Sequence, residues 1–151
     1  MFSGNQLCLF LKLLSALSLS DLLKSKKINY EGAVMLQPTT PFRQIKEIQE
    51  ISKLLIDNIK KDIGIVSVRK VDDSHPARMY TAENERLIPW EKNSLMEFLP
   101  RQELPTVYLR DGGYYGLTPK MLSEGIPVSS QSLFYVRNSP YNLNIDNEDD
   151  L

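Results

Sequence analysis

The sequence predicts an α/β fold, because two short apolar runs are joined by an amphipathic stretch of helical period. Residues 32–36, Gly-Ala-Val-Met-Leu, are apolar throughout, which is typical of a strand buried on both faces. From Gln44 onward apolar residues recur at helical spacing, and a second apolar run follows at 65–68. Strand, helix and strand form a βαβ unit with an expected right-handed crossover. We expect the first strand to be central in the sheet and parallel to the second.

Prolines and glycines set the boundaries of these elements. Pro38 and Pro41 end the first strand, and Gly64 closes the helix before the second strand begins. Upstream, leucines at helical spacing over 9–24 predict another helix, which ends in basic residues as helix C-termini prefer. The apolar stripe of the crossover helix consists of Ile45, Ile48, Ile51, Leu55 and Ile59.

The segment 72–102 differs from the rest of the chain. It is polar, has no sustained period, and carries scattered aromatic residues at Tyr80, Trp90 and Phe98. A structureless loop of this length is uncommon in a compact domain. The segment is therefore either an excursion with its own hairpin or a partly mobile arm.

Short elements are expected to follow this segment. The sequence predicts a strand at 106–109, a tight turn at 111–113, a short helix at 119–123 and a strand at 133–136. The acidic stretch 144–150 is typical of the capped first turn of a helix.

Composition excludes several functional classes. The chain of 151 residues has the size of one domain, and its 42% hydrophobic and 25% charged residues are typical of a soluble globular protein. A net charge of −1 without clustered Lys or Arg argues against nucleic-acid and membrane partners. The single cysteine, Cys8, excludes a disulfide framework and a thiolate metal site, and it fits a cytoplasmic location. The apolar run 7–19 is interpreted as a core-facing helix, with a signal segment or a non-native start as alternatives.

A polar loop follows the first predicted strand, where open α/β sheets bind ligands. In the stretch 35–43, Met-Leu-Gln-Pro-Thr-Thr-Pro-Phe-Arg, Gln37 stands just past the strand end. Its amide can donate and accept hydrogen bonds, and the two prolines restrict its backbone. An ordinary proline-bounded turn explains the same residues equally well.

Two more candidates surround the next predicted strand. Arg101 and Gln102 supply a guanidinium and an amide, and the planar guanidinium suits a carboxylate or a phosphate. Tyr115 follows a pair of glycines, and its ring could pack on the face of a sugar. The alternatives are a surface ion pair for Arg101 and a half-buried strand tyrosine for Tyr115.

A metal site and a catalytic histidine are the remaining possibilities. Asn144 and Asp146 point to one side of an extended segment, and such a pair could supply part of a Mg²⁺ shell together with phosphate oxygens. A helix N-cap explains the same acidic residues. His75, the only histidine, has no Ser, Cys or metal partner motif, so a loop role is the favoured interpretation.

Four blocks in this order resemble the acylneuraminate cytidylyltransferase (CMP-sialic acid synthetase) family. LQPTTPFR at 36–43 is similar to the family's LLQPTSPLR block, and HPAR at 75–78 to its HP-x-K/R element. RQELPTVYLRDGGYYG at 101–116 resembles its RQ-x-LP…NG-x-IY block, and NIDNEDDL at 144–151 its IDIDTxxDL ending. Together the blocks span most of the chain beyond Gly32.

The resemblance implies a doubly wound, Rossmann-like nucleotidyltransferase sheet with an inserted arm at about 79–99 that exchanges with a partner subunit, hence a homodimer. It implies activation of an acidic nine-carbon sugar: CTP and an N-acylneuraminate give a CMP-sugar and diphosphate. Asp146 falls on a metal-binding aspartate for Mg²⁺, whereas Asn144 replaces the first aspartate of many members. Arg101 is expected to be catalytic as well as substrate-binding. The positions that match the family's contacts to the sugar are Gln37, Arg78, Arg101 and Tyr115.

The chain also departs from the family. The family opens with a strand and a phosphate-binding loop of the A-R-x-G-S-K-G type, but Ser3-Gly4-Asn5 carries no Lys or Arg and is expected to precede no strand. The resemblance thus implies one partial domain, 1–151, truncated at both ends and inactive as a fragment. The alternative is a non-catalytic sugar-acid-binding or dimerisation module. A third possibility is a related acid, such as a pseudaminic, legionaminic or ketodeoxyoctonate-type sugar.

Overall fold

The structure is a computed structural model that describes residues 7–11, 16–27, 29–71, 73–91, 94–138 and 145. The chain divides into two compact units. We call Met1–Val68 with Arg110–Leu151 the core unit and Arg69–Leu109 the inserted unit. The expected arm at about 79–99 falls within the inserted unit.

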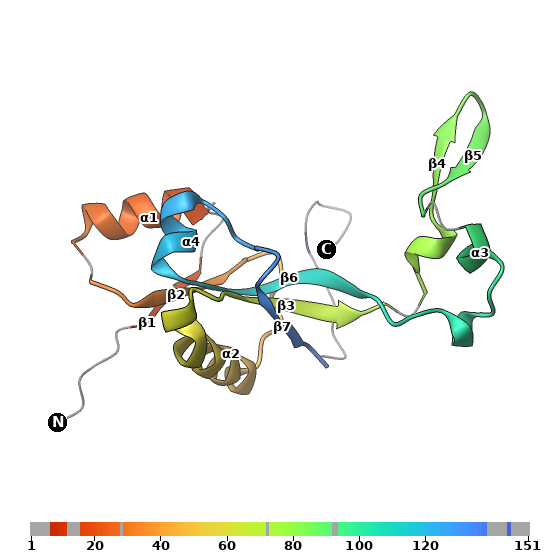
Figure 1. The fold of residues 1–151 in the computed structure, drawn as a ribbon. Coiled ribbons are helices and arrows are strands. Elements are labelled where there is room, and N and C mark those ends of the chain that lie inside the picture. Colours follow the sequence, from red (N-terminus) through yellow and green to blue (C-terminus); the bar gives the residue numbers. More distant parts are fainter. Residues whose placement is uncertain are drawn as a thin grey trace. The chain divides into compact units, whose positions relative to one another are not determined.

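A mixed β-sheet forms the centre of the core unit (Figure 1). In the described part of the chain the strand order is β1-β2-β6-β3-β7. β1 pairs with β2 in parallel, β3 pairs with β7 in parallel, and β6 is antiparallel to β2. The strands are β1 (Leu7–Leu11), β2 (Gly32–Leu36), β3 (Ile65–Lys70), β6 (Tyr108–Leu117) and β7 (Leu133–Val136).

β6 lies between β2 and β3, which corrects the expected sheet. Ala33 faces Leu117 across the β2–β6 pair. On the other edge of β6, a Cβ added to Gly116 would lie 3.1 Å from the Ile65 Cβ, and the Tyr114 amide donates to the Ser67 hydroxyl at 2.8 Å. β2 and β3 therefore run in the same direction, as predicted, but they are not neighbours. The central strand is β6, and not β2.

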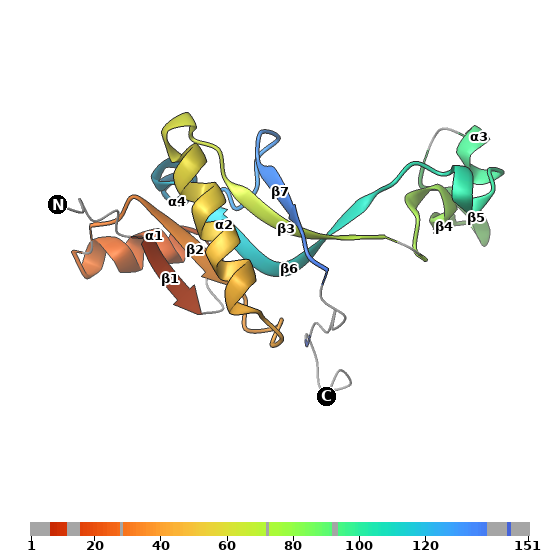
Figure 2. The same cartoon turned by 90° about the horizontal axis from the view of Figure 1, so that it is seen from below.

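Helices cover both faces of this sheet. α1 (Ala16–Ser25) and α4 (Pro119–Glu124) pack together on one face, and α2 (Ile45–Asn58) lies on the other (Figures 1 and 2). Each face has its own apolar cluster, in which Leu122 and Leu55 are fully buried. Burying one such side chain contributes about 1.5–3 kcal/mol. The α/β class is confirmed, while the doubly wound topology stays a prediction.

The crossover helix largely follows the predicted stripe. Ile51 and Leu55 are fully buried, whereas Ile45, in the first turn, is 76% exposed. The helix passes into a 3₁₀ turn, η1 (Ile59–Lys61), and Asp62 ends it in a left-handed conformation. Glu47 is buried among the apolar positions, which the stripe does not predict.

The predicted helix at 9–24 is wrong at its start. Leu7–Leu11 forms strand β1, which pairs with all five residues of β2, and Ala16–Ser25 is the helical part among the described residues of this range. Ser3-Gly4-Asn5 therefore does precede a strand. A short apolar run cannot be assigned to helix or strand by its period alone. Here the edge of β2 provides hydrogen-bond partners that the local sequence does not reveal.

The predicted turn at 111–113 is also wrong, because these three residues lie inside β6, a single strand of ten residues. Gly112 has φ 71°, a conformation that glycine adopts without steric cost, so the strand bends there without reversing. The predicted helix at 119–123 and the predicted strand at 133–136 are confirmed as α4 and β7.

The inserted unit has its own hairpin, which decides between the two interpretations of segment 72–102. β4 and β5 are antiparallel and turn at Asn84 and Glu85, both with positive φ, as a tight hairpin turn requires. Every residue of both strands is exposed. The elements of this unit are η2 (Pro76–Arg78), β4 (Tyr80–Glu83), β5 (Arg86–Pro89), α3 (Ser94–Glu97) and η3 (Arg101–Glu103).

No helix in the described ranges is long and apolar enough to cross a membrane.

Candidate functional site

The loop that follows β2, residues 37–43, is the first candidate site, and we call it the strand-end loop. It begins at the carboxyl end of a buried strand, the position predicted for ligand binding. The Gln37 carbonyl accepts a hydrogen bond from the Thr40 amide at 3.2 Å and another from the Arg43 guanidinium. The Gln37 side chain is half-buried, and Thr40 is buried. The loop is thus closed on itself with Gln37 at its start.

A segment distant in sequence reaches the same loop. The Ile145 amide donates to the Thr39 carbonyl oxygen at 2.7 Å. Ile145 lies between Asn144 and Asp146, which carry the predicted metal site, but both of these lie outside the described residues. The backbone of Ile145, the residue before the predicted metal ligand Asp146, is therefore hydrogen-bonded to a residue two positions after Gln37.

Tyr115 lies in β6 opposite Met35, and its side chain belongs to the apolar core. It is only 7% exposed and contributes to the cluster beneath α1 and α4. Burial raises the pKa of its phenol above the usual value. The alternative to sugar stacking for this tyrosine was a half-buried position in a strand, and the structure places it deeper, in the core. Its contact with a sugar stays a prediction.

A buried ionic cluster adjoins the strand-end loop, and its centre is Arg137, directly after β7. The Arg137 side chain is 1% exposed. Its guanidinium pairs with Glu47 at 3.3 Å and with Asp111 at 3.1 Å, and it donates to the Phe42 carbonyl at 2.8 Å. Its charge also lies 5.1 Å from the centre of the Tyr114 ring, within cation–π range.

The carboxylates of this cluster have further partners. The Tyr114 hydroxyl donates to Glu47 at 2.7 Å, and Asp111 accepts from the Ser67 hydroxyl at 2.5 Å and from the Gly113 amide at 3.0 Å. Burial, and then the bond to Glu47, raise the pKa of Tyr114 well above its usual value. Each carboxylate therefore has hydrogen-bond donors besides the guanidinium, and the network spans β6, α2 and the strand-end loop.

Arg43 carries a second positive charge at the edge of this cluster. Its Nε is buried and has no hydrogen-bond partner among the described residues. Burial is the main cause that lowers the pKa of Arg43. Because its Nη2 donates to the Gln37 carbonyl, Arg43 links the two ends of the strand-end loop.

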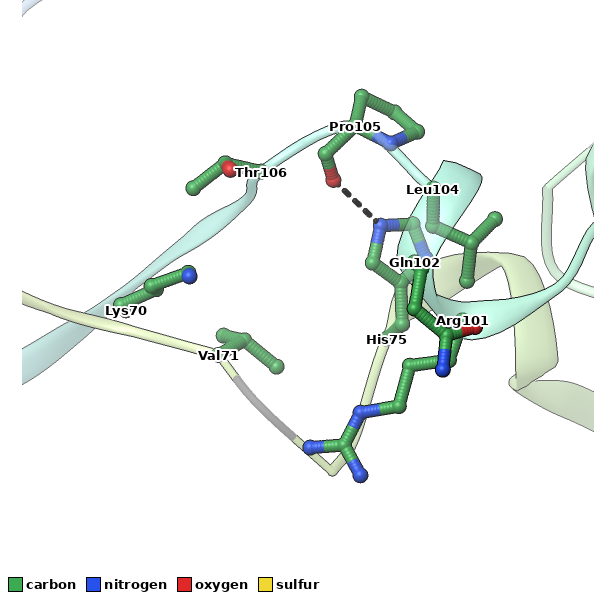
Figure 3. A pocket seen from close by; sticks show the side chains of 8 residues that line it. All are labelled: Lys70, Val71, His75, Arg101, Gln102, Leu104, Pro105 and Thr106. Carbon is green, nitrogen blue, oxygen red and sulfur yellow. Dashed lines mark hydrogen bonds between the residues drawn. The ribbon is translucent and has the colours of Figure 1, made fainter.

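The inserted unit contains the second candidate site, a cavity of about 380 Å³ (Figure 3). Lys70 and Thr106 lie on one side of it, and Arg101 and Gln102 lie on the other. Two cationic side chains with an amide and a hydroxyl suit a small anion such as a carboxylate. The apolar part of the lining consists of Val71, Leu104 and Pro105.

Arg101 pairs with Asp73 at 3.0 Å, and both side chains are largely exposed. This is the surface ion pair that the sequence left open as the alternative. Exposed pairs contribute about 0–1 kcal/mol, so a ligand carboxylate can compete with Asp73 for the guanidinium. Arg78, the other predicted basic contact, donates to the Leu99 carbonyl at 3.3 Å and is exposed.

His75 also lines the cavity, and both of its ring nitrogens have partners. Nδ1 accepts from the Ala77 amide at 3.1 Å, so Nε2 carries the proton and donates to the Pro105 carbonyl at 3.0 Å (Figure 3). The neutral ring thus joins the 75–78 turn to the 105 segment. This geometry agrees with the loop role that the sequence favours for His75.

Arg101 and Arg78 lie in the inserted unit, and Gln37 and Tyr115 lie in the core unit. Asp146 is outside the described residues, so the Mg²⁺ site stays a prediction. Among the residues that the structure describes, no group of three or more His, Cys, Asp or Glu side chains could hold a metal ion.

Comparison with known proteins supports the fold. No protein-family model matches the sequence, and no curated protein matches it. A solved structure titled 4-diphosphocytidyl-2C-methyl-D-erythritol synthase, from Anaerococcus prevotii DSM 20548, is similar with a TM-score of 0.52 and 14% sequence identity. The similarity covers 92% of this chain and 64% of that one, so the chain spans less than two-thirds of the synthase. The chain is therefore similar in fold to this solved structure.

Proposed function

We propose that this protein is a CTP-dependent nucleotidyltransferase that acts on an acidic nine-carbon sugar. The reaction is CTP and an N-acylneuraminate, or a related sugar acid, to the CMP-sugar and diphosphate. Its main support is the hydrogen bond from Ile145 to Thr39, which joins the segment before Asp146 to the loop that begins at Gln37. The fold shared with a synthase whose named product carries a diphosphocytidyl group is a second support. We also propose a cytoplasmic location, in line with the single cysteine.

The reaction needs positioning and charge neutralisation more than covalent chemistry from the protein. The anomeric hydroxyl of the sugar attacks the α-phosphorus of CTP. A P–O bond forms, the bond to the bridging oxygen breaks, diphosphate leaves, and the hydroxyl proton is released. Gln37 would hydrogen-bond the sugar, and Arg101 would hold its carboxylate. Asp146 would hold Mg²⁺, which would offset the charge of the phosphates.

Arg101→Ala should weaken binding of N-acetylneuraminate by about tenfold or more, because a charge-assisted hydrogen bond contributes roughly 1.5–3 kcal/mol. Isothermal titration calorimetry of the purified chain measures this directly. Arg86→Ala is the matched control, since it removes one exposed arginine from the hairpin of the same unit. Equal affinities of the wild-type chain and the Arg101 variant would remove Arg101 from the site.

The same preparation separates the enzyme from the alternative, a non-catalytic sugar-acid-binding or dimerisation module. Diphosphate release is followed with CTP, Mg²⁺ and each of four acids: an N-acylneuraminate, a pseudaminic acid, a legionaminic acid and a ketodeoxyoctonate. Release with one acid identifies the enzyme and its substrate. Sugar binding without release is the result expected both of the binding module and of an inactive partial domain, and the absence of both contradicts the proposal.

We further propose that the inserted unit mediates homodimerisation. Its hairpin and the following segment expose several large apolar side chains, and such side chains mark interaction sites where they form a patch. Leu87 is 69% exposed, Trp90 65% and Phe98 81%.

Trp90→Ala should shift the chain from dimer to monomer in multi-angle light scattering, because aromatic residues at an interface carry much of its binding energy. Ile45→Ala is the control, since Ile45 is an equally exposed apolar residue of the core unit at 76%. A wild-type monomer, or a Trp90 variant that remains dimeric, would contradict the arm as the interface.

A further inference from the structure

The buried cluster around Arg137 is bonded to the strand-end loop. Arg137 Nη2 donates to the Phe42 carbonyl at 2.8 Å, near the end of that loop. The Arg137 backbone is itself fixed, because its amide donates to the Val68 carbonyl at 2.8 Å. One residue therefore connects β3 and the end of β7 with the loop that follows β2.

The guanidinium has little freedom to move within this cluster. Glu47 and Asp111 engage its Nε and Nη1, so the remaining Nη2 is aimed at the Phe42 carbonyl. Gly113 passes directly beside it: a Cβ added there would lie 2.6 Å from Nη1. A side chain at this position would force the guanidinium to shift, and Gly113 is one residue before Tyr114, whose ring lies against the same charge.

We propose that Arg137 is a positioning residue that fixes the strand-end loop and thereby the placement of Gln37. This inference rests on the proposed function insofar as Gln37 is taken to contact the sugar. Three hydrogen bonds support this role. Arg137 binds the Phe42 carbonyl, and the adjacent Arg43 binds the Gln37 carbonyl. Within the same loop, the Thr39 carbonyl accepts from the Ile145 amide. No local sequence pattern indicates this link, because Arg137 lies 95 residues from Phe42.

Amide hydrogen exchange, read residue by residue by NMR, tests the positioning role. Arg137→Lys keeps the positive charge but loses the fork that reaches three partners at once. Gly113→Ala keeps every charge and displaces the guanidinium. In both variants we expect the amides of Thr40 and Ile145 to exchange at least about tenfold faster, since both bond within the loop or to it.

The exchange rate of an amide on the other face of the sheet distinguishes a global loss of stability from a local release of the loop. The Leu122 amide bonds to the Thr118 carbonyl in α4 at 3.0 Å, and its exchange should rise less than that of Thr40. Lys120→Met is the control variant, because it breaks an exposed pair with Asp62 and leaves the loop untouched. Equal acceleration at Thr40 and Leu122, or none at Thr40, overturns the positioning role.

Calorimetry with N-acetylneuraminate completes the test. If the wild-type chain binds the sugar, both variants should bind it about tenfold more weakly. Faster exchange at Thr40 with unchanged affinity overturns the link between the loop and the sugar. If the wild-type chain does not bind the sugar, the proposed function fails, while the exchange data still decide whether Arg137 orders the loop.

Discussion

Arg137→Met is expected to lower the free energy of unfolding by about 3–5 kcal/mol, because it leaves the buried carboxylates of Glu47 and Asp111 without the guanidinium that pairs with them. The two carboxylates are 8% and 4% exposed, so water cannot replace the lost partner. Methionine fills much of the same volume, which keeps a cavity from adding to the loss. Urea unfolding followed by far-UV circular dichroism measures the change.

The control and a compensating variant make this expectation specific. Lys120→Met breaks the Lys120–Asp62 pair, whose side chains are 64% and 37% exposed, and should cost less than about 1 kcal/mol. Adding Glu47→Gln and Asp111→Asn to Arg137→Met should recover part of the loss, since neither buried carboxylate then remains. An Arg137 variant as stable as the Lys120 variant would show that the cluster is not buried.

Stability should fall steeply above about pH 10, and Tyr114 should be one of its main causes. Burial first, and then the bond to Glu47, raise the pKa of Tyr114 in the folded protein, while Arg137 partly opposes them. A raised pKa contributes stability that is complete below the unfolded value of 10.0 and is lost as pH rises toward the folded value. The slope is up to about 1.4 kcal/mol per pH unit for each such group.

Tyr135 is expected to contribute to the same loss of stability at high pH. Its pKa is raised by burial and then by its hydrogen bond to Glu50 at 2.5 Å. Urea unfolding between pH 8 and 11.5 should show a shallower decline for Tyr114→Phe and for Tyr135→Phe, and the shallowest for the double variant. A decline equally steep in all four proteins would exclude these tyrosines as its source.

Local sequence was sufficient for the elements whose pattern has only one structural solution. These signals act within a few residues: the apolar run of β2, the apolar stripe of α2, and the prolines at the starts of the strand-end loop and of α4. The position of Gln37 at a strand end followed from the same information. β1 was missed because five apolar residues fit a strand or a helix equally well, and only pairing with β2 decides.

The sequence by itself therefore determined the α/β class, the crossover helix and the location of the strand-end loop, since these depend on local period and on residues that stop an element. Only the tertiary structure decided that β6 enters the sheet between β2 and β3, because strand pairing is set by contacts between distant segments. It alone also revealed the buried cluster. From sequence alone, charged residues are expected at the surface. Burial of Arg137, Glu47 and Asp111 becomes favourable only because the three side chains pair in the folded protein.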